Sequence, residues 1–335
     1  MTSSLPTDPP TVADIRAAAA RIAGVAVRTP LLEAPLLNDR IGARLLLKPE
    51  CLQRTGSFKF RGAYNRISMI PAGDRGRGVV AYSSGNHAQG VAAAARMLNT
   101  PATIIMPSDA PAIKRANTEA WGATVVPYDR YSENREAIGA ALAERTGATI
   151  VRPYDDPGII AGQGTIGLEI AAQAAELDAS LDAVLVCCGG GGLVSGTALA
   201  LSDTAPGVPV WCVEPEGFDD TRRSLDSGTR QSNAADAHSI CDALLAPTPG
   251  EITFPLNKRL LAGGLAVSDD EALAAMATAF EAFKVVLEPG GAVALAAALS
   301  GKLPIAGKTI AVVGSGGNVD PAVFRRALES AKGAE

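Results

Sequence analysis

Apolar runs of strand length alternate with longer runs of helical character along nearly the whole chain, and this order constrains the fold most. Alternation of this kind predicts an α/β fold in which helices cover both faces of a parallel sheet. One set of expected elements comprises the helix 12–22, the strand 78–82, the helix 87–98, the strand 102–106, the helix 112–121, the strand 123–127, the helix 132–145 and the strand 148–151. A second set comprises the helix 165–175, the strand 183–187, the helix 193–201, the strand 210–213, the helices 269–283 and 292–299, the strand 309–313 and the helix 321–332. Residues 218–264 are rich in Pro, Gly, Ser and Asp, and we expect surface loops there.

Two turns between an expected strand and an expected helix have a composition suited to binding anions. The first is Ser-Ser-Gly-Asn-His at 83–87, and the second is Gly-Gly-Gly-Gly-Leu at 189–193. Free backbone N–H groups and the helix dipole favour negative charge at such a helix start. The first turn could also be an ordinary helix cap, whereas four consecutive glycines favour close approach of a phosphate. The two turns together would hold a phosphorylated cofactor and a substrate carboxylate.

A dinucleotide site is an alternative for the glycine turn. The G-x-G-x-x-G pattern, begun at Gly190, requires a third glycine at position 195, but this position is Ser195. Glu214, after the next strand, lies roughly where a ribose-binding acid would be found. A nucleotide-binding reductase therefore remains a rival, although it leaves the turn 83–87 and the segment around Lys59 unexplained.

Lys59 lies in the segment Thr-Gly-Ser-Phe-Lys-Phe-Arg-Gly-Ala at 55–63, among apolar and small residues. Desolvation lowers the pKa of a lysine and makes its amine available for Schiff-base chemistry. A surface lysine on an amphipathic helix is the other interpretation of this residue taken alone.

Four motifs in order carry a resemblance to a known family: residues 57–63, 83–90, 189–193 and 314–318. They resemble the fold-type II enzymes that use pyridoxal phosphate (PLP), specifically the threonine/serine dehydratase and serine racemase group, from about residue 22 to the C-terminus. Phe60 follows the lysine where cysteine and threonine synthases typically have Asp, which favours the dehydratase branch. The resemblance implies an α/β, two-domain, three-layer fold similar to tryptophan synthase β. Residues 1–77 and 152–335 would form the large PLP-binding domain, and residues 78–151 a small mobile domain.

The resemblance also implies roles for the matching residues. Lys59 would carry PLP as a Schiff base, Phe58 would pack beside its ring, Asn86 would bond its O3′ atom and Ser315 would meet its pyridine nitrogen. The phosphate would be held by the backbone of Gly189, Gly190, Gly191, Gly192 and Leu193. The substrate carboxylate pocket would be lined by Ser83, Ser84, Asn86 and His87. Lys59 and Ser84, on opposite sides of the ring, would be the catalytic residues.

These roles imply that a small β-hydroxy amino acid loses water and then ammonia to give a 2-keto acid. Threonine or serine is the first expected substrate. The alternatives are 3-hydroxyaspartate dehydration and racemisation of serine or aspartate, for which Ser84 would be a second proton carrier. In serine racemase-like members an arginine at the position of Arg135 faces the active site, where it would favour a second carboxylate on the substrate. An exposed helix arginine is the other interpretation of Arg135.

The segment 213–220 resembles the divalent-cation loop of serine racemase and some dehydratases. The carboxylates of Glu214 and Asp220 and the carbonyl of Phe218 would bind Mg²⁺, or alternatively Ca²⁺ or Mn²⁺, because hard cations prefer oxygen ligands. An acidic surface turn is the alternative that spacing alone favours. Lys114 and Arg115 are expected on a helix surface, and Glu288 in a segment near the cofactor but not in contact with it.

Composition and charge narrow the possible partners. The formal net charge of −5 and the pI near 5.3 argue against nucleic acid as a partner. No stretch reads as a signal peptide, a membrane span or a basic membrane patch. The five cysteines are scattered without a CxxC pair, which predicts free thiols and a cytoplasmic location. The resemblance adds the expectation of a homodimer that acts on a small molecule.

Overall fold

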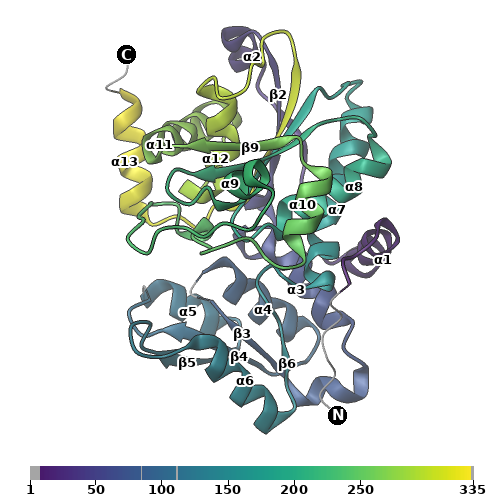
Figure 1. The fold of residues 1–335 in the computed structure, drawn as a ribbon, viewed down its shortest axis with the longest axis vertical. Helices are drawn as coiled ribbons and strands as arrows, with labels where there is room; N and C mark the ends of the chain where they lie inside the picture. Colours follow the sequence, from purple (N-terminus) through teal and green to yellow (C-terminus); the bar gives the residue numbers. More distant parts are fainter. Residues whose placement is uncertain (1–7, 84, 111, 333–335) are drawn as a thin grey trace.

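A computed structural model of the protein describes residues 8–83, 85–110 and 112–332, which form two β-sheet units stacked one above the other (Figure 1). In the larger sheet β1 is antiparallel to β2, and all other neighbouring strands are parallel. In sheet order its strands are β1 (Leu32–Glu33), β2 (Arg44–Pro49), β10 (Thr309–Gly314), β7 (Ala183–Cys187), β8 (Val210–Pro215) and β9 (Gly263–Val267). The expected α/β architecture is thereby confirmed.

The smaller sheet has four strands, and all of its strand pairs are parallel. In sheet order they are β5 (Thr124–Tyr128), β4 (Ala102–Pro107), β3 (Val79–Tyr82) and β6 (Thr149–Ile150). One face packs on α4, and the other face packs on α6 through Val80, Ile105 and Tyr128. Successive side chains of each strand point to opposite faces, and both faces are covered by a helix.

Helices cover both faces of the two sheets (Figure 1). The α-helices are α1 (Val12–Ile22), α2 (Pro35–Ile41), α3 (Lys59–Ser68), α4 (Asn86–Met97), α5 (Ala112–Ala120), α6 (Arg135–Thr146), α7 (Pro157–Glu176), α8 (Gly192–Thr204), α9 (Asp220–Ser227), α10 (Thr253–Leu260), α11 (Asp269–Thr278), α12 (Pro289–Leu299) and α13 (Pro321–Lys332). Short 3₁₀ turns are η1 (Glu50–Leu52), η2 (Arg54–Gly56), η3 (Ala72–Arg77) and η4 (Asp242–Leu244), and η5 (Ala279–Phe283) is a π-helical turn that continues α11.

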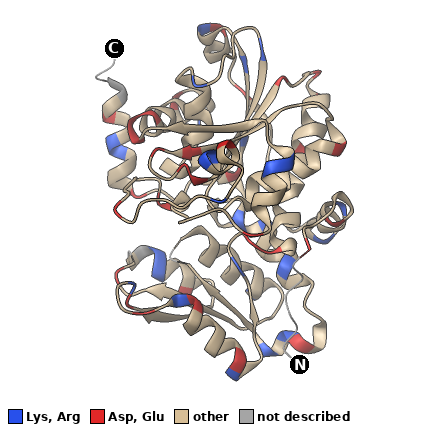
Figure 2. Ribbon diagram, viewed as in Figure 1, with Lys and Arg blue, Asp and Glu red and all other residues tan. Residues whose placement is uncertain are grey.

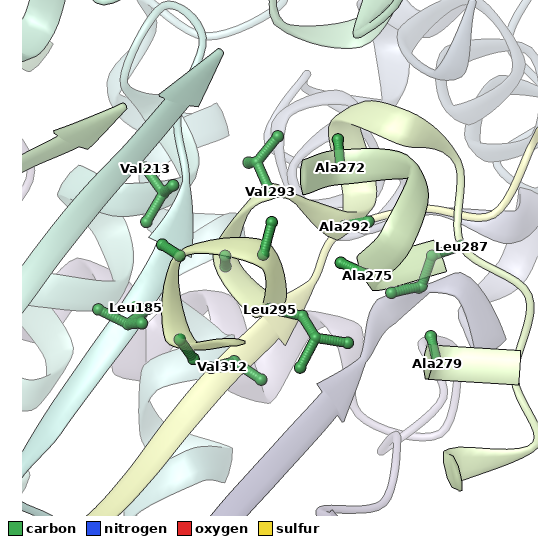
Figure 3. Close-up of a cluster of buried hydrophobic side chains, with 14 of the residues drawn as sticks. Leu185, Val213, Ala272, Ala275, Ala279, Leu287, Ala292, Val293, Leu295 and Val312 are labelled. Atoms are coloured by element: carbon green, nitrogen blue, oxygen red, sulfur yellow. The ribbon is translucent and has the colours of Figure 1, made fainter. Parts of the chain in front are cut away.

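The main core lies between the six-stranded sheet and the alanine-rich helices α11 and α12 (Figure 3). Leu45 and Leu47 of β2 point into this core, whereas Leu46 points to the opposite face, against α7 and α8. The strands of this sheet are therefore buried on both sides, which places the ends of the strands, rather than their faces, within reach of a ligand.

Most expected elements are present, and α1, β7 and α13 have the bounds that the sequence predicts. A hydrogen-bonded capping box between Thr11 and Asp14 explains the start of α1. The helix expected at 165–175 instead begins at Pro157, where the Asp156 carboxylate accepts backbone hydrogen bonds as its N-cap. The glycines near its start do not interrupt α7. They allow close packing, because a Cβ at Gly162 would lie 2.6 Å from the Gly62 Cα atom.

The expectation for residues 218–264 is wrong in part, and two strands near the N-terminus were not anticipated. Residues 218–264 are not only surface loops, because they form α9 and α10 and begin β9, whose backbone pairs with β8. The first 60 residues also contain β1 and β2, which the sequence pattern did not indicate. Among the described segments we find no helix with the length and hydropathy of a bilayer-spanning segment. Acidic and basic residues are interspersed along the chain in both units (Figure 2).

Candidate active site

A cleft of ≈ 200 Å³ opens at the carboxyl ends of parallel strands from both sheets. Ser83 follows β3, Gly189 follows β7 and Ser315 follows β10, and all three line the cleft. Ligand sites of open α/β sheets lie at this edge, because the turns after neighbouring strands converge there. Of the predicted site residues, the cleft brings together Phe58, Lys59, Ser83, Asn86, His87, Arg135, Gly189, Gly190, Gly191, Gly192, Leu193 and Ser315. Ser84 lies outside the described residues.

Lys59 is the first residue of α3 and reaches into the cleft. Its Nζ atom donates a hydrogen bond to the Pro153 carbonyl at 2.7 Å and lies 5.1 Å from the centroid of the Phe58 ring. Burial lowers the pKa of the Lys59 amine to about 8, while the nearby Glu288 carboxyl acts in the opposite direction. At pH 7 roughly a tenth of this amine is therefore uncharged and able to act as a nucleophile or base, far more than for an ordinary lysine.

A buried network of charges holds the start of α3 in place. The Arg61 guanidinium bonds to both oxygens of Glu50 at 2.8 Å and to Glu169 of α7 at 2.7 Å. The Lys48 ammonium bonds to Glu169 at 2.6 Å, and the side chains of Lys48, Glu50 and Arg61 are fully buried. Burial opposes ionisation of Glu50, but its pairing with Arg61 lowers the pKa below its usual value. This network fixes the helix that presents Lys59, and no pattern in the sequence indicated it.

The glycine turn joins β7 to α8, and its glycines are required by packing as well as by any ligand. A Cβ at Gly190 would lie 2.4 Å from the Tyr154 ring, and one at Gly191 would lie 2.8 Å from Asn257 and Thr253. Gly191 also adopts φ +94°, in the left-handed region that favours glycine. Because the turn opens α8, its backbone N–H groups form the kind of cradle in which phosphate binds.

The turn after β3 brings Asn86 and His87 into the cleft. Asn86 begins α4, and its Nδ2 atom donates to Glu288 Oε1 at 2.5 Å. His87 Nε2 lies 2.9 Å from the Val151 carbonyl and must donate to it, so the buried Nδ1 is a bare acceptor without a hydrogen-bond partner among the described residues. Burial, reinforced by the Lys59 charge, lowers the pKa of His87 to about 3. His87 is therefore a neutral acceptor and not a cation for a carboxylate.

Ser315 is held at the end of β10 by backbone hydrogen bonds. Its N–H donates to the Gly291 carbonyl at 3.2 Å, and its carbonyl accepts from the Phe58 N–H at 3.1 Å. The residue is buried, yet it contributes to the cleft wall. A hydroxyl at this position can donate or accept one hydrogen bond without adding charge.

Glu288 lies closer to the site than the sequence suggested, because it lines the cleft itself. It is the N-cap residue of α12 and is only 3% exposed. Burial and, to a smaller extent, the charge of Asp242 raise the pKa of Glu288 to about 8, against the opposing effect of the hydrogen bond from Asn86. The cleft therefore contains a carboxyl group that is largely protonated at neutral pH. The resemblance placed Glu288 near the cofactor but not in contact with it, and its position before Pro289 at the start of α12 gave no sign that it lines the cleft.

Arg135, the first residue of α6, faces the cleft. Its guanidinium lies 5.4 Å from the centroid of the Tyr82 ring, within the range of a cation–π contact. The side chain is 42% exposed and makes only a long contact of 3.3 Å with neighbouring Glu136. Arg135 therefore lines the cleft from a helix and keeps a partly exposed guanidinium, and its role toward a substrate carboxylate stays a prediction.

Lys114 lines the cleft and does not simply lie on a helix surface, as the sequence suggested. It lines the cleft from α5 and forms an ion pair with Asp242 of η4 on the opposite wall. The pairing joins residues far apart in the sequence, which local patterns could not indicate.

The three predicted metal ligands lie near the end of β8, apart from the described cleft lining. Both Glu214 oxygens accept backbone N–H groups, from Thr221 at 3.0 Å and Arg222 at 2.8 Å. Asp220 Oδ1 accepts from Asn233 at 2.6 Å, while the buried Asp220 Oδ2 has no partner among the described residues. Burial and the charge of Asp220 raise the pKa of Glu214 well above its usual range, and burial raises the pKa of Asp220 to about 6. Phe218 is buried in the intervening turn.

Comparison with known proteins gives consistent matches over almost the whole chain. Residues 22–316 match the family model described as "Pyridoxal-phosphate dependent enzyme". The L-threo-3-hydroxyaspartate ammonia-lyase of Saccharomyces cerevisiae is 43% identical over 311 residues, which cover 93% of this chain and 94% of the relative. An enzyme of the same description from Pseudomonas sp is 45% identical over 307 residues, covering 92% and 95%. Among solved structures, the T.th. threonine deaminase superposes with a TM-score of 0.88 at 44% identity, covering 93% of this chain and 99% of that chain.

Proposed function

The chain belongs to the family of pyridoxal-phosphate-dependent enzymes, and from this premise we propose that it removes water and ammonia from a small β-hydroxy amino acid. The observation that carries this proposal is the Lys59 amine, whose pKa is lowered to about 8 in a cleft that also contains the glycine turn 189–192. An uncharged lysine amine beside a phosphate cradle is the minimum arrangement for holding PLP covalently.

The residues of the cleft fit this cofactor. Side chains at Gly189–Gly192 would meet Leu244, Tyr154, Thr253 or Asn257, so the backbone there is bare and available to a phosphate. The Phe58 ring and the Ser315 hydroxyl would flank the cofactor ring and its nitrogen, and the Asn86 amide would meet its O3′ atom. When bound, PLP supplies an electron sink for the bond broken at the substrate's α-carbon.

The protein residues have separable tasks in this reaction. Lys59 is the base that takes the α-proton, since burial lowers the pKa of its amine to about 8. Ser315 cannot hold a pyridine nitrogen protonated as a carboxylate would, which favours rapid loss of the β-hydroxyl. Ser83 and Asn86, with Ser84 between them in sequence, bind the substrate carboxylate. The Nδ1 atom of His87, which has no partner among the described residues, is available to accept a hydrogen bond.

Arg135 favours 3-hydroxyaspartate as the substrate. A guanidinium that lines the cleft without a strong carboxylate partner is suited to the second carboxylate of a dicarboxylic substrate. The identity of 43–45% to two L-threo-3-hydroxyaspartate ammonia-lyases supports the same choice. Threonine or serine is the second candidate, supported by the 44% identity to the T.th. threonine deaminase.

The test is a comparison of ammonia release from 3-hydroxyaspartate, threonine and serine by the wild-type protein and by Arg135→Ala. Loss of the arginine is expected to lower kcat/KM for 3-hydroxyaspartate by on the order of 10- to 100-fold, and that for threonine far less. Arg145→Ala, at the other end of α6, is the matched control. An equal effect on both substrates would exclude the dicarboxylate assignment, and failure to release ammonia from any of the three would exclude the lyase.

Racemisation is a third outcome that the same samples can report. Ser84 is the residue that would carry the second proton, so Ser84→Ala is expected to abolish any change in chirality while elimination from the correct enantiomer continues. Chiral chromatography of the unreacted amino acid measures this directly. The reductase alternative has no support in the family match.

A divalent cation at Glu214, Asp220 and the Phe218 carbonyl is the second part of the proposed function. The pKa values of both carboxyls are raised, and Asp220 Oδ2 is buried without a partner among the described residues, as expected for a site that a cation would complete. Mg²⁺ is the first choice, with Ca²⁺ or Mn²⁺ as alternatives. Addition of Mg²⁺ to chelator-treated protein is expected to raise its Tm, and Asp220→Asn is expected to remove that response.

Movement of residues 78–151 against residues 1–77 and 152–335 completes the proposal, since closure over the substrate would exclude water. Protection from hydrogen exchange in α5 and α6 on addition of substrate would test it.

A homodimer is expected as well, and its mass in solution is measured by light scattering.

A further inference from the structure

The side chain of Asn318, just after β10, joins three segments that are far apart in the sequence. Its Nδ2 atom donates to the Thr55 carbonyl at 2.7 Å and to Asn86 Oδ1, also at 2.7 Å. Thr55 lies shortly before Lys59, whereas Asn86 begins α4 in the unit that contains the smaller sheet. One amide group thus connects the loop before the reactive lysine to a residue across the cleft.

The chemistry of these contacts fixes which way the Asn86 amide points. A backbone carbonyl only accepts hydrogen bonds, so the Asn318 atom that faces Thr55 must be the nitrogen. Its second hydrogen is then directed at Asn86, and the Asn86 atom that receives it must be the oxygen. Asn86 is left with its NH₂ group facing Glu288, to which it donates at 2.5 Å, and facing the cleft.

The Thr55 carbonyl is itself held rigidly. Thr55 has φ +62°, an uncommon conformation for a residue with a branched side chain, and its buried hydroxyl has no partner among the described residues. The loop persists because the Gly317 N–H bonds to the Gly56 carbonyl at 2.9 Å and the Phe58 N–H bonds to the Ser315 carbonyl at 3.1 Å. Gly56 is required there, since a Cβ would lie 2.6 Å from Asn318 Oδ1.

We propose that Asn318 is a positioning residue, which acts through Asn86 by locking that amide with its NH₂ group toward the ring of the bound cofactor. This role rests on the proposed PLP site. Without Asn318, the contact with Glu288 alone would orient the Asn86 amide, and a carbonyl oxygen facing the phenolic oxygen of the cofactor would repel it. The position of the Thr55 carbonyl thus determines, through Asn318, that Asn86 presents its NH₂ group to the cleft as a hydrogen-bond donor.

Asn318→Asp removes the effect with almost no change in shape. A carboxylate donates no hydrogen bond, so it cannot bond to the Thr55 carbonyl, and it attracts the Asn86 NH₂ group away from the cleft. We expect the dissociation constant for PLP to rise about tenfold, the factor that corresponds to loss of one hydrogen bond, and the visible band of lysine-bound PLP to shift. Asn99→Asp adds the same charge at an exposed position and is the matched control.

A double-mutant cycle separates positioning from a general loss of structure. In an Asn86→Ala background, Asn318→Asp is expected to change the affinity for PLP less than about twofold, because the residue through which it acts is gone. If Asn318→Asp does not fold, Asn318→Ala takes its place, and its effect on the affinity for PLP is compared with and without the Asn86 side chain. Equal effects with and without the Asn86 side chain, or no effect at all, overturn the inference. A wild-type protein that binds no PLP at Lys59 overturns the proposed function as well.

Discussion

Lys114 of α5 and Asp242 of η4 form an ion pair that crosses the mouth of the cleft. Among the described residues it is the one ion pair that joins residues 78–151 to the remainder of the chain. Both side chains retain access to solvent, at 23% and 53% exposure. A substrate that enters the cleft therefore meets a cation already engaged by a carboxylate of the protein.

Asp242→Asn is expected to favour dicarboxylic substrates. The change leaves Lys114 without its partner and removes a charge that repels a second carboxylate, so KM for 3-hydroxyaspartate should fall about two- to fivefold, as for other partly exposed pairs. Lys114→Met should raise the same KM, and KM for threonine should change little in both variants. Steady-state kinetics measure this, with Arg115→Met on the same helix as the control. A higher KM for 3-hydroxyaspartate in Asp242→Asn would contradict the expectation.

Capture of PLP by the cofactor-free protein should depend on pH through Lys59. Only the uncharged amine reacts with an aldehyde, and burial lowers the pKa of Lys59 to about 8 from its ordinary value of 10.5. The rate of appearance of the visible band should therefore rise between pH 7 and 9 and level off above, with a midpoint of about 8. A midpoint near that of free lysine would show that the amine is not desolvated.

Glu288→Gln should make the free energy of unfolding less dependent on pH. The folded-state pKa of Glu288 is about 8 and its ordinary value is 4.5, so between these values the folded protein holds a proton that the unfolded chain releases. The wild-type protein consequently loses stability as pH rises through this window, and a neutral glutamine does not contribute to that loss. Urea unfolding at pH 5, 6.5 and 8 should show the variant gaining on the wild type as pH rises, by up to a few kcal/mol. A constant difference across the three pH values would refute the assignment.

Gly190→Ala should disturb the glycine turn through Tyr154. The added methyl group would lie 2.4 Å from the Tyr154 ring, and the resulting displacement should cost about 1–3 kcal/mol of unfolding free energy and weaken binding of PLP. Tyr154→Ala in the same chain should restore part of the stability, because it removes the clash. Gly73→Ala, where a Cβ meets nothing within 4 Å, is the control, and calorimetry with PLP titration measures both quantities. Equal Tm values for Gly190→Ala and the control would contradict this account.

The sequence predicts the location of the cleft better than it predicts which charged residues line the cleft. The turns at 83–87 and 189–193 and the reactive segment at 57–63 carry short-range signals, namely small residues at strand ends and a lysine among apolar neighbours, and the structure brings described residues of all three together. The strand–helix order likewise predicts the two layers of helices, since hydrophobic periodicity is a local property.

Features that depend on distant partners could not be predicted in this way. Lys114 has the flanking residues of a surface helix, and only the packing of η4 opposite α5 turns it into a cleft residue. The glycines at the start of α7 weaken the local helical signal, although packing against α3 and α8 requires them. Glu288 reads as an ordinary N-cap until its burial beside Asn86 is known.

The sealed ion network of Lys48, Glu50, Arg61 and Glu169 has a consequence for how such an enzyme can diversify. It holds the helix that carries the Lys59 amine through buried ion pairs, while Lys114 and Arg135 project from helices of the other unit. Substitutions on those helices can alter which side chain is accepted and leave the bond-breaking residues untouched. New substrate preferences can therefore evolve on one unit without rebuilding the chemistry that the other unit holds in place.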